Sequence, residues 1–419
     1  MNKKNGNQIF KKNISVSILY LMSADLVNAV LGMLFAFVMG RFFGAEYLGI
    51  YTFSFMLATM LWTLGESGYE VEIPREIAQE PHRMKALISD AQVFKTRILL
   101  FGFPIFCFYG IIALGEWYFL AIMPWVIPAS ANMTLRSVCR GLKMFPSISI
   151  IEISTSLFMY PVMTLVLWFT KNIALVFLVL VFSELIKMLL YLYTVRRIEN
   201  FHLGILFPYY KSLFSFSSMI TRINERRGFT FVNLLTMLQY RSTLLILPLF
   251  QSNYMVGVYT VGMRFVSLLR LLPASTINVL LPEFSSENKS EHKSLLVKSL
   301  SYMFLINVTI AVTIFALAEF IIDLTFQIPE AIGILRIMIW AIIPISMHQI
   351  IETFLMSRNY EMQISKSLFG TALFTFLAVA VVNFFYGITG IAYIFVIGEI
   401  VLLTLYIFLL RKSGKRERK

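Results

Sequence analysis

The sequence has little of what a soluble enzyme needs. Charged residues make up only 14% of its 419 positions, and there are two cysteines and four histidines. Cys107 and Cys139 stand alone in apolar segments, so neither a disulfide framework nor a cysteine metal site is expected. No glycine-rich phosphate loop, nucleophile motif or metal-ligand spacing stands out. These absences argue against an ATPase or a hydrolase, so we expect no enzyme activity and no cofactor.

Apolar residues dominate instead, at 58% of the chain. An apolar run of roughly 20 residues is long enough to cross a bilayer as a helix. The sequence therefore predicts an all-α polytopic membrane protein. Twelve runs have spanning length: 15–40, 47–66, 97–115, 117–139, 147–170, 173–195, 228–250, 254–282, 298–323, 331–357, 364–386 and 388–410.

The net charge of +13 has a membrane explanation rather than a nucleic-acid one. Nearly all basic residues fall in alternate loops, which the positive-inside rule assigns to the cytoplasm together with both termini. Contacts with membrane lipids are expected, and no nucleic acid. The predicted organisation is a cytoplasmic N-terminus 1–14, an N-lobe 15–195, a cytoplasmic interfacial loop 196–227, a C-lobe 228–410 and a basic cytoplasmic tail 411–419.

Two short motifs recur at nearly equal offsets. Gly49-Ile50-Tyr51-Thr52 returns as Gly257-Val258-Tyr259-Thr260, 208 positions later. Glu184 ahead of Tyr191 is echoed by Glu399 ahead of Tyr406, at an offset of 215. A duplicated unit of six helices keeps its orientation, which predicts two six-helix lobes related by a parallel pseudo-two-fold repeat. Chance similarity of apolar sequences is the alternative, and the equivalent glutamates suggest a scaffold role.

The stretch from Phe229 to Pro282 is a hairpin of two predicted spans with a turn near Ser252. Arg241 lies 11 residues before Ser252 and Arg264 lies 12 after it. At 1.5 Å per residue both guanidiniums lie at a similar depth, roughly 17 Å from the tip. Arginine near the midplane is costly unless it faces water or a partner. The pair predicts an anion site, and pairing with buried acids is the alternative.

Other charged residues extend this candidate site. Arg226 and Arg227 precede the hairpin and could capture an anionic head group at the cytoplasmic mouth, or simply anchor the helix end. Asp25, in the middle of the first span, is a candidate counter-ion for Arg241 or Arg264, or a cation site for coupling or charge balance. Proton and sodium are both open as the coupling ion.

Three further acidic or titratable side chains lie in or beside predicted spans. Glu66 closes the second span, where a solvated loop boundary is expected. His348 and Glu352 lie one turn apart on a predicted helix, as a stabilising polar pair or a proton relay.

Several motifs together resemble a known family. They are Arg41-Phe42-Phe43-Gly44-Ala45-Glu46-Tyr47-Leu48-Gly49-Ile50-Tyr51, Gly65-Glu66-Ser67-Gly68-Tyr69, Arg75-Glu76-Ile77-Ala78, Val256-Gly257-Val258-Tyr259, Leu281-Pro282-Glu283-Phe284-Ser285 and Tyr386-Gly387-Ile388-Thr389-Gly390. They are similar to the polysaccharide transporter family, the lipid-linked oligosaccharide flippases of the multidrug/oligosaccharidyl-lipid/polysaccharide exporter superfamily. Many members carry an aspartate before the basic residue of helix seven. This chain has Tyr240 there, so that aspartate's coupling role does not carry over.

The resemblance implies a flippase that moves an undecaprenyl-pyrophosphate-linked oligosaccharide outward across the bacterial cytoplasmic membrane by alternating access. Its product would enter O-antigen, capsule or exopolysaccharide assembly, beside a polysaccharide polymerase complex. Two other functions stay open. One is a cation-coupled drug or metabolite exporter on the same scaffold, which would favour acidic cavity residues. The other is a non-transporting membrane scaffold for glycan assembly, in which the arginines would be dispensable.

Overall fold

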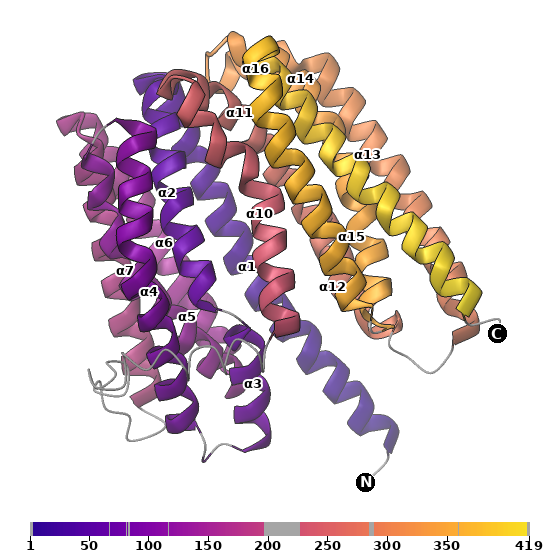
Figure 1. Cartoon of the computed structure of the whole chain (residues 1–419). Coiled ribbons are helices and arrows are strands. Elements are labelled where there is room, and N and C mark those ends of the chain that lie inside the picture. Colours follow the sequence, from indigo (N-terminus) through magenta and orange to yellow (C-terminus); the bar gives the residue numbers. More distant parts are fainter. Residues whose placement is uncertain are drawn as a thin grey trace. The chain divides into compact units, whose positions relative to one another are not determined.

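A computed structural model describes residues 3–66, 68–80, 82, 84–115, 117–196, 227–284, 289–358 and 360–416, and these residues form helices and turns without strands (Figure 1). The first half contains α1 (Lys3–Phe43), α2 (Ala45–Glu66), α3 (Tyr69–Gln79), α4 (Met84–Leu114), η2 (Tyr118–Ala121), η3 (Met123–Trp125), α5 (Val126–Gly141), α6 (Phe145–Thr170) and α7 (Ile173–Arg196). The second half contains α10 (Arg227–Phe250), α11 (Asn253–Leu269), α12 (Leu271–Phe284), α13 (Lys289–Thr325), α14 (Glu330–Met338), η5 (Ile339–Ala341), α15 (Ile342–Met356) and α16 (Glu361–Arg416).

The all-α membrane fold is confirmed. Nine helices within the described residues are long and apolar enough to cross a membrane. One of them, within α16, covers the predicted spans 364–386 and 388–410. Gly387, between these two spans, breaks the helix with a φ of 54°. The predicted span 117–139 is two short 3-10 turns followed by α5, and the apolar part of α10 is only Leu234–Phe250. The number twelve and the two-lobe repeat therefore stay predictions.

The hairpin carrying Arg241 and Arg264 forms as expected, with one difference. Ser252 caps α11 by accepting a hydrogen bond from the Met255 backbone N–H at 3.4 Å, because serine at this position satisfies an otherwise unpaired donor. A continuous helix over 254–282 was wrong, since α11 ends at Leu269 and α12 begins at Leu271. Arg270 stands at this break.

The chain divides into two compact units. The first unit is residues 1–36 and 54–227, and the second unit is residues 37–53 and 228–419. Within the first unit α5 and α6 pack on α7, and α3 packs on α5 (Figure 1). Its core includes Tyr69, Phe94, Leu135 and Tyr191. Large apolar side chains such as Phe169, 80% exposed, lie on the outer faces, as helices surrounded by lipid require.

Residues 37–53 join the second unit through a close helix crossing. A Cβ on Gly49 would overlap the Asn253 carbonyl, and a Cβ on Gly257 would overlap the Ala45 carbonyl. Only glycine permits such close approach of two backbones. The contact is reciprocal at the repeat offset of 208. Arg41 strengthens the same region by donating to the Leu324 carbonyl at 2.7 Å.

Candidate functional site

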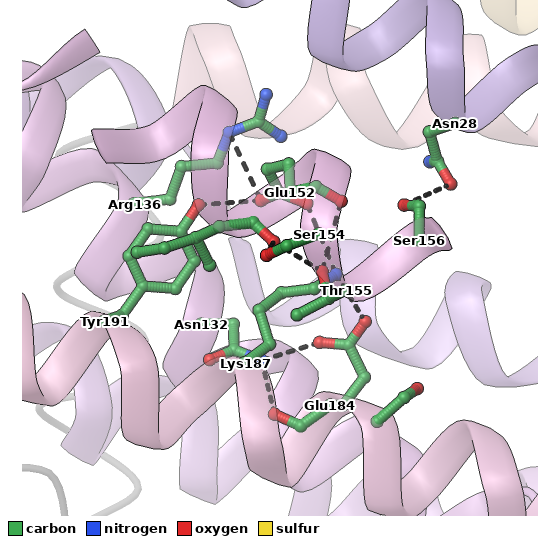
Figure 2. Close-up of polar contacts among 12 residues, drawn as sticks. Asn28, Asn132, Arg136, Glu152, Ser154, Thr155, Ser156, Glu184, Lys187 and Tyr191 are labelled. Atoms are coloured by element: carbon green, nitrogen blue, oxygen red, sulfur yellow. Dashed lines mark hydrogen bonds and ion pairs between the residues drawn. The ribbon is translucent and has the colours of Figure 1, made fainter. Parts of the chain in front are cut away.

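A network of charged side chains lies inside the first unit, in segments whose neighbours are almost all apolar (Figure 2). Glu184 on α7 accepts a hydrogen bond from Asn132 on α5, at 2.6 Å between Nδ2 and Oε2. Lys187, one turn further along α7, lies 2.9 Å from the other oxygen of Glu184. The Asn132 amide also donates to the Glu184 backbone carbonyl at 2.8 Å. The network thus joins α5 to α7.

Glu152 on α6 connects this pair to a second group of partners. Its carboxylate lies 3.3 Å from the Lys187 ammonium and accepts a hydrogen bond of 2.7 Å from the Tyr191 hydroxyl. Arg136 on α5 approaches it at 3.9 Å, and all these contacts appear in Figure 2. The Lys187 and Glu152 side chains are each 15% exposed. Two cations and two carboxylates therefore balance one another where an unpaired charge would be costly.

Arg136 also reaches α1, where it pairs with Asp25 at 3.1 Å. The Asp25 side chain is 63% exposed, so this carboxylate lies at the edge of the network rather than within it. A counter-ion role toward Arg241 or Arg264 was one of the predicted alternatives for Asp25, and both arginines belong to the second unit. The described partner is Arg136. The coupling or charge-balance role of Asp25 stays a prediction.

Glu66 is not at a solvated loop boundary, and that expectation was wrong. Its carboxylate lies 2.6 Å from the Lys95 ammonium on α4, and the side chains are 9% and 1% exposed. Lys95 also donates to Thr134 Oγ1 on α5 at 2.9 Å, and Gln92 donates to the same hydroxyl at 2.8 Å. The pair and its hydrogen bonds therefore connect α2, α4 and α5. Lys95 precedes the predicted span 97–115, whereas in the structure it lies inside α4.

The second unit holds a smaller buried pair. His348 on α15 lies 2.8 Å from Glu399 on α16, between Nε2 and Oε2, and both side chains are 1% exposed. His348 and Glu352 interact electrostatically, as the polar pair predicted from their spacing would, but the side chain that His348 contacts directly is Glu399. Glu352 instead accepts a hydrogen bond of 3.4 Å from the Tyr406 hydroxyl, while the Tyr406 ring packs against the His348 ring at 5.9 Å.

The two buried groups use positions that correspond at the repeat offset. Glu184 and Glu399 are 215 positions apart, and so are Tyr191 and Tyr406. In each unit the tyrosine hydroxyl donates to a carboxylate on a neighbouring helix, Glu152 or Glu352. The glutamate takes an amide partner in one unit and an imidazole partner in the other. Both glutamates bind neighbouring helices, which is the scaffold role suggested by sequence.

The predicted anion site lies in the second unit. Arg264 on α11 is half-buried, its Nη2 donates a long hydrogen bond of 3.5 Å to Thr52 Oγ1, and its Nε is buried without a hydrogen-bond partner among the described residues. Arg241 on α10 is also half-buried. Arg227 begins α10 with its side chain outside the described part, and Arg226 lies outside the described residues.

Two other features of the described residues concern further ligands. A cavity of about 170 Å³ between α6 and α7 is lined by Ser154, Thr155 and Ser183 with apolar neighbours, and it is smaller than usual sites for drug-sized ligands. It cannot hold a lipid-linked oligosaccharide. No three histidine, cysteine or acidic side chains within the described part gather as metal ligands.

Sequence reasoning missed Asn132, Glu152, Lys187 and Lys95. The available signal was a set of polar side chains inside apolar runs, with Lys187 three residues after Glu184 on the same helix face. Their partners lie far apart in sequence, 39 positions for Tyr191 and Glu152 and 52 for Asn132 and Glu184. Only the packing of α5, α6 and α7 reveals the network.

Comparisons with known proteins identify a sequence family and several similar folds. A sequence-family profile described as "Polysaccharide biosynthesis protein" matches residues 15–286. No curated protein sequence matches the chain. The fold is similar to that of the lipid II flippase MurJ in an inward closed conformation, with a TM-score of 0.73 and 14% identity over 94% of this chain and 87% of the other.

Two structures of a multidrug resistance MATE family transporter of the MOP superfamily are also similar. The inward-facing form has a TM-score of 0.63 and 13% identity over 96% of this chain and 99% of that one. The outward-facing form has a TM-score of 0.62 and 15% identity over 97% and 96%. All three neighbours are named as transporters or flippases, not as enzymes. At these identities the likeness establishes the fold alone, that of a multi-pass membrane protein.

Proposed function

Because the chain belongs to the polysaccharide biosynthesis protein family, we propose that it is a flippase for an undecaprenyl-pyrophosphate-linked oligosaccharide. It moves this lipid from the inner to the outer leaflet of the bacterial cytoplasmic membrane by alternating access, with both termini in the cytoplasm. The product enters surface polysaccharide assembly, where a polymerase is the expected partner. The transporter fold and the family membership support this reaction, and the half-buried arginines of α10 and α11 support a pyrophosphate-linked substrate.

The observation that carries the proposal is the contrast between Arg264 and three cations of the first unit. Lys95, Lys187 and Arg136 each have a carboxylate partner within 4 Å. Arg264 has no ion pair among the described residues, and its Nε is buried without a hydrogen-bond partner. A guanidinium inside an apolar helix with an open donor is suited to an anionic ligand. A pyrophosphate offers several oxygens, and arginine binds such oxygens in a bidentate manner.

Arg241 is the second proposed ligand. It is half-buried on α10. Arg241 lies 11 residues before Ser252 and Arg264 lies 12 residues after it. Two guanidiniums at similar depth along α10 and α11 match the two phosphates of the head group. Arg226 and Arg227 would receive the head group before it enters, at the cytoplasmic start of α10.

The test is binding and flipping by the purified full-length protein in proteoliposomes. Arg264→Ala should weaken binding of undecaprenyl pyrophosphate by about 10- to 100-fold, because a charge-assisted hydrogen bond contributes about 1.5–3 kcal/mol. Arg264→Lys should restore part of the loss, since the ammonium keeps the charge without the fork. Arg336→Ala is the matched control, because Arg336 already has a partner in Glu319 at 3.8 Å.

Two outcomes would redirect the proposal. Unchanged binding and flipping in both Arg264→Ala and Arg241→Ala would remove the anion site and favour a non-transporting role in glycan assembly. Transport of a cationic drug, without binding of undecaprenyl pyrophosphate, would favour an exporter on the same scaffold. Flipping that fails while the lipid still binds would separate substrate recognition from movement.

A further inference from the structure

The two buried groups differ in how they balance charge. In the first unit Glu184 and Glu152 face the fixed cations Lys187 and Arg136. The position 215 residues after Lys187 is Leu402, which is 1% exposed and packs in an apolar cluster with Leu368. The second unit therefore keeps the glutamate but not the lysine. In place of Asn132 its glutamate has the titratable His348.

Among the described residues around His348, the carboxylates outnumber the cations by one. Glu399 and Glu352 are the two carboxylates of the group. Arg270 is its cation, placed 3.4 Å from the centre of the Tyr240 ring and close enough to interact electrostatically with Glu352. With both acids ionised and His348 neutral, one negative charge is uncompensated. A buried uncompensated charge in a membrane helix costs several kcal/mol.

Two atoms of the pair are open. His348 Nδ1 and Glu399 Oε1 are buried and have no hydrogen-bond partner within the described part of the chain. When His348 Nε2–H donates to Glu399 Oε2, the Nδ1 atom carries a free lone pair. A proton from water can form an N–H bond there without breaking any bond of the pair. The imidazole becomes an imidazolium, and the group becomes neutral.

The other titratable groups around the pair do not supply this proton. Tyr406 donates to Glu352 from α16. Tyr240 on α10 accepts a hydrogen bond of 3.5 Å from Gln349 and lies beneath Arg270. Tyr259 on α11 interacts electrostatically with Glu399. Phenols ordinarily lose their protons only near pH 10, whereas histidine titrates near neutral pH.

We infer that His348 and Glu399 form a reversible proton-binding site in the second unit, and that the network of Glu184 and Glu152 in the first unit differs from it because lysine and arginine fix its charge. The ligand is a single proton, bound at the imidazole beside an ionised carboxylate. Use of this proton to drive transport rests on the proposed function, whereas the binding of the proton does not.

The experiment is a pH titration of the full-length protein in lipid nanodiscs with ¹⁵N-labelled histidine. The chain has four histidines, and His348→Gln identifies the His348 signal by its loss. Between about pH 5 and pH 9, the range in which histidine normally titrates, the ring signal should move reversibly from neutral imidazole to imidazolium. A His348 ring that stays in one protonation state across this range overturns the inference.

Variants test whether the carboxylates hold the proton. Glu399→Gln should lower the ratio of protonated to neutral His348 at a given pH at least about tenfold, because an opposite charge at this distance changes the protonation equilibrium by that order. Glu352→Gln should lower it as well, while leaving the direct hydrogen bond in place. Glu319→Gln is the control, a carboxylate of the same unit whose side chain is 70% exposed. Equal responses of Glu399→Gln and Glu319→Gln contradict the inference.

The readout does not depend on glycan transport. A titrating His348 in a protein that fails to bind undecaprenyl pyrophosphate would leave the proton site standing and remove the proposed function. If Glu399→Gln does not fold, the wild-type titration and Glu352→Gln still decide the matter.

Discussion

Replacing Lys95 by methionine tests whether buried ion pairs fix the helices of the first unit. Lys95 and Glu66 lie 2.6 Å apart with side chains 1% and 9% exposed. Removing the ammonium leaves a buried carboxylate whose Oε2 already has no hydrogen-bond partner among the described residues. Breaking such a pair from one side costs about 3–5 kcal/mol. Lys95→Met should therefore shift the unfolding equilibrium by roughly two to three and a half powers of ten.

The second substitution should repair much of this loss. Glu66→Met alone should cost less than Lys95→Met, because Lys95 keeps its hydrogen bond to Thr134. With both residues changed to methionine, the carboxylate and the ammonium are replaced by apolar side chains of similar size. Such a replacement is often close to neutral. The double variant should be more stable than Lys95→Met.

The assay is a titration of the purified protein in mixed micelles with sodium dodecyl sulfate, followed by far-UV circular dichroism. Arg75→Met is the exposed control, because Arg75 is 70% exposed in its pair with Glu76 and such pairs contribute at most about 1 kcal/mol. Additive losses in the double variant would refute the reasoning, since independent effects carry no coupling.

Four further predictions concern packing, buried charge and topology. Gly257→Ala should destabilise the protein by about 1–3 kcal/mol, because the new Cβ meets the Ala45 carbonyl. Gly333→Ala should be neutral or stabilising in the same titration, since nothing lies within 4 Å of its Cβ and alanine favours helix. Lys187→Met should be destabilising by about 3–5 kcal/mol, because Glu152 and Glu184 both lose their ammonium partner. Reporter fusions at the two ends should both report the cytoplasm, and opposite sides would reject an even number of crossings.

Local features of the fold were accessible from sequence, because each depends on residues close in the chain. The hairpin turn at Ser252 and the break at Gly387 follow from capping and backbone preferences. The interruption at Arg270 was missed, since an apolar sequence continues on both sides of it. Charge partners were the hardest to predict. Lys95 finds Glu66 29 positions away and His348 finds Glu399 51 positions away, distances at which only packing selects the partner.

The candidate site shows the same limit. Arg264 was identified because one guanidinium in an apolar run is costly wherever the helix packs. The role of Asp25 depends on which cation it meets, and the partner that the structure describes is Arg136 on α5. The sequence shows which charged residues lie in apolar segments, where an unpaired charge is unfavourable. Which neighbour pairs with such a residue is decided only when the chain folds.

The reciprocal contact between α2 and α11 bears on the origin of the chain. Ala45 contacts Gly257, and Asn253 contacts Gly49. Ala45 and Asn253 are 208 positions apart, as are Gly49 and Gly257, so the same pair of repeat positions is in contact twice. An interface in which one position contacts a second, and the second contacts the first, is the signature of a two-fold symmetric dimer. The crossing of α2 and α11 is therefore the contact that two copies of the predicted six-helix unit would make as a symmetric pair, here joined within one polypeptide.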